Sequence, residues 1–110
     1  MAARTAQSDG DAIVYSGSVA VSDADTIKFL NSAGHLVSPT AFSITVTGST
    51  SFAVELTCDQ DVAGTSEWVA IENSPFTADM QAAFVAPVAG LKITNSDITN
   101  PAVVRVIGKL

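Results

Sequence analysis

Residues 41–71 read AFSITVTGSTSFAVELTCDQDVAGTSEWVAI, and this stretch decides the fold of the chain. Apolar and small polar residues alternate over 42–47 and again over 52–58, which is the period of two typical of half-buried strands. Between the two runs, Gly-Ser-Thr-Ser at 48–51 is typical of a turn. A third run, at 67–72, carries the only tryptophan. The three runs predict strands that seed one face of a sandwich core.

The rest of the chain predicts further short strands separated by turns. Five more strands are expected, at 12–15, 18–21, 26–30, 90–94 and 102–107. A turn is expected at 23–25, where Asp-Ala-Asp stands. The segment 76–87 is ambiguous, because it holds helix formers at 79–84 but ends in a strand-like run before a proline. The predicted fold is all-β, a two-sheet antiparallel sandwich of about eight strands with jelly-roll or Greek-key connections.

Length and the leading segment set the predicted domain boundaries. At 110 residues the chain fits one domain. Residues 1–11 are polar and small, so we expect an extended N-terminal arm that cannot pack on itself. Residues 12–110 then form the β-sandwich domain. The chain starts without the apolar core of a signal peptide and has no run long enough to cross a membrane, so we expect it to be made and folded in the cytoplasm.

The charge of the chain disfavours two classes of partner. Eleven acidic residues against five basic ones give a net charge of −6. The basic residues are scattered along the sequence and form no cluster: Arg4, Lys28, Lys92, Arg105 and Lys109. Nucleic acids and anionic membranes both attract concentrated positive charge, so neither is an expected partner. Only 15% of the residues are charged, which leaves apolar surface for contact with another protein.

Catalytic residues and cofactors are not expected. His35 is the single histidine and stands in a predicted turn; Ser and Asp are so abundant that a triad with it carries no information, and an exposed or locally bonded turn histidine is the favoured interpretation. Cys58 is the single cysteine, so no intrachain disulfide can form, and its place in the alternation at 52–58 predicts a small buried hydrophobe. One Cys and one His are too few for zinc. The sequence therefore predicts a protein that is not an enzyme.

Two features leave alternatives open. The pairs Asp23/Asp25 and Asp59/Asp61 could offer oxygen ligands to calcium, but Asp is also an ordinary turn residue, and that interpretation is favoured. Trp68 could stack on a sugar, with Tyr15 as a second aromatic residue. Because Trp68 is flanked by apolar residues in a strand, an anchor in the core or in an interface is the favoured interpretation.

The second half of the chain carries a family resemblance. Four segments follow one another, namely a Trp-bearing strand at Ser66–Ile71, then Phe76–Ala78, then a turn and strand at Ala86–Thr94, and a β-rich end at Val103–Gly108. Together they resemble the C-terminal half of small β-sandwich virion proteins of tailed bacteriophages. The resemblance implies a decoration (cement) protein that binds the outside of an assembled capsid. A carbohydrate-binding or adaptor domain of the phage tail is the alternative.

The resemblance also implies partners and contact residues. The partners would be the major capsid protein and other copies of the same chain, on the capsid surface of the virion. An arm that adds a strand to a neighbour gains backbone hydrogen bonds, and repetition over a symmetric shell makes weak contacts collectively strong. The expected contact residues come from the arm, the first strand and the last strand: Arg4, Thr5, Gln7, Tyr15, Arg105 and Ile107.

Overall fold

The computed structural model describes residues 1–59, 62, 65–85 and 88–110. Within them the chain forms nine strands and no helix, which confirms the all-β prediction. The strands are β1 (Ala2–Asp9), β2 (Ala12–Val19), β3 (Asp23–Leu30), β4 (Ala41–Thr47), β5 (Phe52–Thr57), β6 (Val69–Ala70), β7 (Met80–Phe84), β8 (Gly90–Asn95) and β9 (Ala102–Lys109).

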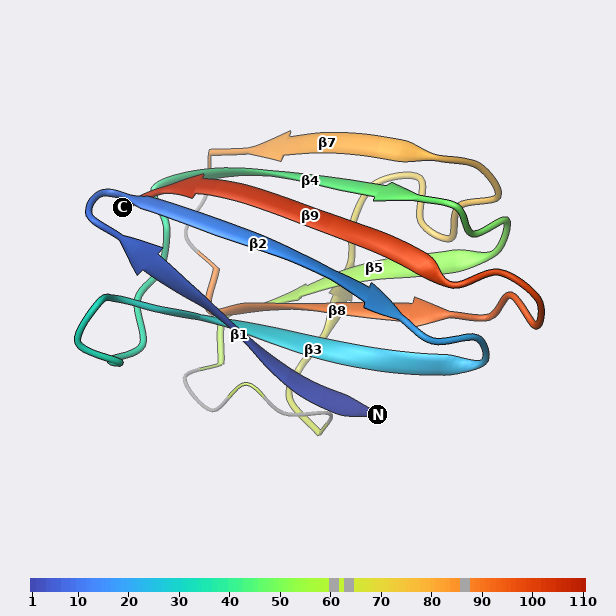
Figure 1. The fold of residues 1–110 in the computed structure, drawn as a ribbon, viewed down its shortest axis with the longest axis horizontal. Coiled ribbons are helices and arrows are strands. Elements are labelled where there is room, and N and C mark those ends of the chain that lie inside the picture. Colours follow the sequence, from blue (N-terminus) through green and yellow to red (C-terminus); the bar gives the residue numbers. More distant parts are fainter. Residues whose placement is uncertain (60–61, 63–64, 86–87) are drawn as a thin grey trace.

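The strands follow one another in a single curled sheet, in the order β6-β5-β8-β3-β1-β2-β9-β4-β7 (Figure 1). We call β6-β5-β8-β3 the β3 half and β2-β9-β4-β7 the β9 half. β1 joins them, because it runs parallel to β3 from Ala2 to Gln7 and then pairs antiparallel with β2 at Ser8 and Asp9. Where two separate antiparallel sheets were expected, the structure therefore has one mixed sheet.

Residues 2–9 are thus a strand of the sheet, where the sequence predicted an arm that cannot pack on itself. Ala6 lies opposite Phe29 and is only 1% exposed, and Ser8 is also buried. The sequence signal of this strand is faint, because small and polar residues occupy the inward positions that would otherwise carry Val or Ile. Partners on both sides supply the stabilisation that the segment lacks by itself.

The core comes from the predicted alternation in β4 and β5. Phe42, Ile44 and Val46 are buried, as are Phe52 and Val54. They pack with inward residues of the neighbouring strands: Ile27, Phe29, Leu91, Ile93, Val104 and Val106. Arg105 and Ile107 are both exposed on β9, on the face opposite the buried Val104 and Val106.

Cys58 is exposed, so the prediction of a buried thiol is wrong. The alternation breaks where β5 ends, with Leu56 only partly buried and Thr57 buried in its place. Thr57 fixes this break, because its carbonyl accepts from the Ala89 N–H at 2.8 Å and its hydroxyl accepts from the Asp59 N–H at 3.1 Å. Cys58 therefore lies beyond the last inward position of the strand.

Three local expectations differ from the structure, and one open question is answered. β2 runs unbroken through Gly17, β3 begins at Asp23 where a turn was expected, and the Trp-bearing strand shrinks to Val69–Ala70. The ambiguous segment forms strand β7. The turn before β3 falls two residues earlier than predicted, at Ser22, whose φ of 52° reverses the chain.

A buried polar cluster ties three turns together at one end of the sheet. The Asn95 side chain accepts a hydrogen bond from the Ser49 hydroxyl at 2.7 Å and donates to the carbonyls of Val19, Ala20 and Asn100. The Asp97 carboxylate accepts from the backbone N–H groups of Thr50, Thr99 and Asn100. The bonds from the N–H of Thr50, the N–H of Thr99 and the Thr50 hydroxyl hold the pKa of Asp97 well below its usual range.

Ala6→Glu should destabilise the protein by at least about 3 kcal/mol, because it places an unpaired charge between the two halves of the sheet. Thr5→Glu is the matched control, since Thr5 is exposed on the same strand. Its effect on the free energy of unfolding should stay within about 0.5 kcal/mol. Denaturant unfolding measures both, and equal stability of the two variants would show that β1 does not pack as described.

Asp97→Asn should lower the melting temperature at neutral pH, because an amide nitrogen would face N–H donors in place of an acceptor. The folded-state pKa of Asp97 is lowered, so the ionised carboxylate stabilises the fold above the unfolded value of about 4. That contribution is lost as pH falls below about 4. The difference in melting temperature from the parent protein should therefore shrink in acid, whereas the exposed-site control Asp11→Asn should match the parent at neutral pH. A gap that is constant with pH would contradict this assignment.

Candidate functional site

A polar groove opens where β1 and β2 separate. The two strands pair with each other only at Ser8 and Asp9 of β1. The rest of β1 pairs with β3, and β2 pairs with β9 along its length. The groove has a volume of about 470 Å³ and is lined by Ala3, Arg4, Thr5, Tyr15, Ser16, Gly17 and Ser18. Three of the six predicted contact residues, Arg4, Thr5 and Tyr15, are therefore brought together at one site.

A charged pair and an aromatic ring give the groove its chemistry. The Arg4 Nε lies 3.5 Å from Oδ2 of Asp25, whose other oxygen accepts from the Ala2 N–H at 3.3 Å. The Asp25 side chain is 3% exposed and that of Arg4 is 51% exposed, so the guanidinium reaches from a buried carboxylate towards solvent. This pairing compensates the cost of burying the carboxylate.

The end of the Tyr15 side chain occupies the space in which a side chain at Gly17 would lie. A Cβ added at Gly17 would come within 2.5 Å of the Tyr15 hydroxyl oxygen, so the absence of a side chain there makes room for the end of the Tyr15 side chain. Partial burial raises the pKa of the Tyr15 phenol, the Arg4 guanidinium lowers it and the Asp25 carboxylate raises it. The phenol therefore stays protonated at neutral pH and can donate a hydrogen bond.

The predicted residues of the last strand lie on the outward face of the sheet. Residues of β2, β9, β4 and β7 that point away from the core form what we call the outer face. Val14 and Ile107 are 65% and 61% exposed and lie opposite each other, and the row continues through Ser43 to Ala83. Arg105 follows in the next row, between Ser16 and Thr45.

Charge on the outer face is the reverse of the overall charge. Its strands carry Arg105 and Lys109 and have no acidic residue at an outward position, in a chain with a net charge of −6. Ser16 lines the groove and also pairs with Arg105, so the groove and the outer face are adjacent. Sequence reasoning missed Val14 and Ala83, because only the strand register places them beside Ile107.

Gln7 has a different setting from the other predicted residues. Its side-chain amide donates to the carbonyls of Asn31 and Ser32 at 3.3 and 3.4 Å. Gln7 therefore holds the loop after β3 and lies outside the groove lining. Its exposed side chain is the part that a partner could still reach.

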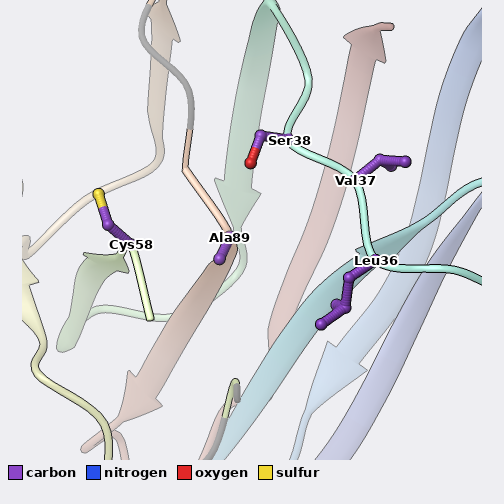
Figure 2. Close-up of a pocket in the computed structure, with 5 residues that line it drawn as sticks. All are labelled: Leu36, Val37, Ser38, Cys58 and Ala89. Carbon is purple, nitrogen blue, oxygen red and sulfur yellow. The ribbon is translucent and has the colours of Figure 1, made fainter. Parts of the chain in front are cut away.

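A second hollow, more apolar than the groove, lies where β3 and β5 end and β8 begins. It has a volume of about 400 Å³ and is lined by Leu36, Val37, Ser38, Cys58 and Ala89. Figure 2 shows that these side chains come from three segments, namely the loop after β3, the end of β5 and the residue before β8. Among the described residues that line this hollow, none is a histidine or a carboxylate that could activate the Cys58 thiol.

The open questions on metals and Trp68 have partial answers. Asp25 is engaged by Arg4, the Asp59 carboxylate accepts from the Glu67 N–H at 2.7 Å, and Asp61 lies outside the described residues. In the described part of the chain, no group of three or more His, Cys, Asp or Glu residues could hold a metal ion.

Trp68 is half-buried and carries the Lys92 ammonium 5.9 Å from its ring centroid, so a cation already covers one face of the indole.

Comparison with known proteins supports the fold class. No protein-family model and no curated protein sequence matches the chain. A periplasmic inhibitor of g-type lysozyme from Aeromonas hydrophila is similar in structure, with a TM-score of 0.52 and 14% identity over 98% of this chain and 97% of that chain. The pre-peptidase C-terminal domain of a Bacillus anthracis collagenase also has a TM-score of 0.52 and 14% identity, over 96% of this chain and 93% of that chain.

These likenesses show the fold alone. A family 29 carbohydrate-binding module aligns with a TM-score of 0.48 and 10% identity over 89% of this chain and 70% of that chain, which is too weak to argue from. Among the described residues, none forms a helix that is long and apolar enough to span a membrane.

Proposed function

We propose that this protein is a non-enzymatic structural component of a tailed-bacteriophage particle, which binds the outer surface of the assembled capsid and stabilises it. The observation that carries the proposal is the outer face, where exposed Val14 and Ile107 lie side by side, with Arg105 and Lys109 two positions away along β9. A weakly charged sheet face that exposes apolar side chains beside an arginine is typical of a protein interface. The family resemblance of the second half suggests which protein it meets.

The coat surface that fits this face is apolar with acidic residues around it. Burying an exposed Val or Ile contributes about 1.5–3 kcal/mol, and Arg105 and Lys109 add charge complementarity. Single contacts of this kind are weak, but a shell repeats them many times. Arg4, Thr5 and Tyr15 in the adjacent groove would meet a second segment of the coat protein or a neighbouring copy.

Ile107→Asp should weaken binding to capsids that lack this protein by at least about tenfold, because it removes an apolar contact and adds an acid beside an acidic partner. The matched control is Ile98→Asp, since Ile98 is 79% exposed but lies in the loop between β8 and β9. Co-sedimentation of purified protein with such capsids measures both variants. Equal binding of Ile107→Asp and the parent protein would exclude the outer face.

A second candidate function is carbohydrate binding in the groove, as expected of a phage tail domain. The observation that favours it is the convergence of Tyr15, Arg4 and the groove serines, which offer a ring edge and several hydrogen-bonding groups to hydroxyls. Trp68 is less suited, because Lys92 covers one face of its ring.

If sugars bind in the groove, titration of a glycan panel should shift the amide resonances of residues 3–5 and 15–18. Tyr15→Ala should abolish these shifts, whereas Trp68→Ala should preserve them. Shifts centred on Trp68, or no shifts with any glycan, would remove the groove as a sugar site. Capsid binding lost in Ile107→Asp but kept in Tyr15→Ala would favour the capsid role.

A further inference from the structure

The two edge strands of the sheet, β6 and β7, differ in how they are protected against pairing with a further strand. β6 ends the sheet on one side, with only two residues, and acidic residues stand two positions from it in the sequence, at Glu67 and Glu72, and opposite it on β5, at Glu55. Shortness and charge are the usual means by which proteins prevent an edge from pairing with another strand. β7 ends the sheet on the other side and lies at the outer margin of the β9 half in Figure 1.

β7 has none of these protections. Its residues, Met80–Phe84, include no charge, no proline and no glycine, and they pair with β4 without interruption. The following residue, Val85, is apolar and 88% exposed. Such an edge presents backbone N–H and C=O groups to any strand of matching length.

The core holds β7 in the extended form that pairing needs. The Phe84 ring stacks on Phe42 with centroids 5.1 Å apart, and Met80 and Ala82 also pack against the core. Gln81 and Ala83 point outward. Asp79, the nearest acid in sequence, is tied to the Gly48 N–H at 3.0 Å. A rigid edge loses little conformational freedom when a partner strand is added.

We propose that β7 pairs antiparallel with β7 of a second copy of this chain, across a two-fold axis. A second copy fits because β7 is neutral, so two copies that each carry a net charge of −6 can meet there without bringing like charges together. The two-fold interface is self-complementary and closes at a dimer. The pairing joins two outer faces into one continuous surface, in which the row from Val14 to Ala83 of one copy meets the row from Gln81 to Ser16 of the other.

The length of β7 fixes the register. All five residues pair only when Ala82 faces Ala82 of the second copy, and Gln81 then faces Ala83 of the second copy. Because both positions are outward, charges can be placed there without entering either core. The dimer does not depend on capsid binding, so it can be tested on the purified protein alone.

Sedimentation equilibrium tests the pairing with three double variants. The parent protein should be a dimer, and added salt should strengthen it by screening two charges of −6. Gln81→Lys with Ala83→Lys places like charges opposite each other across the axis and should raise the dissociation constant at least tenfold. Gln81→Glu with Ala83→Lys places opposite charges there and should restore the dimer.

The matched control is Ser16→Lys with Ser18→Lys, which adds the same two charges at exposed outer positions of β2. It should leave the dimer unchanged, and thermal unfolding of every variant checks that the fold is intact. A parent protein that stays monomeric at millimolar concentration would overturn the proposal and leave the edge for a strand of another protein. So would a dimer that the β7 lysine pair does not weaken more than the control pair does.

Discussion

β1 pairs with β3 over six residues and with β2 over two, and the shape of the molecule depends on this double pairing. The parallel register from Ala2–Asp25 to Gln7–Leu30 fixes β1 on the β3 half, and the short hairpin at Ser8–Ile13 fastens it to the β9 half. One strand therefore makes two halves into one curled sheet. The groove follows from the same geometry, since it opens where β1 leaves β2.

The central strands could be predicted from the sequence, and β1 could not. In β4 and β5 large apolar residues alternate with polar ones, and burial of Phe42, Ile44 and Phe52 follows that pattern. In β1 the inward residues include Ala6 and Ser8, whose small size leaves no apolar period to detect. Parallel pairing between segments about twenty residues apart is a tertiary event, and local propensity does not encode it.

The sequence suggested contact residues but not how they are arranged in space. Arg4, Thr5 and Tyr15 were chosen as contact residues of an arm and a strand, and the structure gathers them in one groove. Ile107 and Arg105 were chosen as contact residues of the last strand and both are exposed, whereas the position of Val14 beside Ile107 needed the register of β2 with β9. The prediction that Cys58 is buried failed because the alternation of apolar and polar residues does not show at which residue a strand ends.

The parts of the surface differ in their charge and in the apolar side chains that they expose. No lysine or arginine occurs between Phe29 and Leu91, so the loops and the β6 edge carry most of the negative charge. The outer face carries Arg105 and Lys109 with exposed Val14 and Ile107, and the β7 edge is neutral. This distribution keeps copies apart in most orientations and leaves two surfaces on which contact costs little electrostatic energy.

Native-state hydrogen exchange of β1 tests the central claim most directly, because every surface described above depends on β1 holding the sheet together. The amides of residues 2–9 that face β3 should exchange as slowly as those of β3 itself, in one cooperative unit with the core. Exchange of the whole segment at the rate of an unfolded chain, with β3 still protected, would contradict the account and return residues 1–11 to a loose arm.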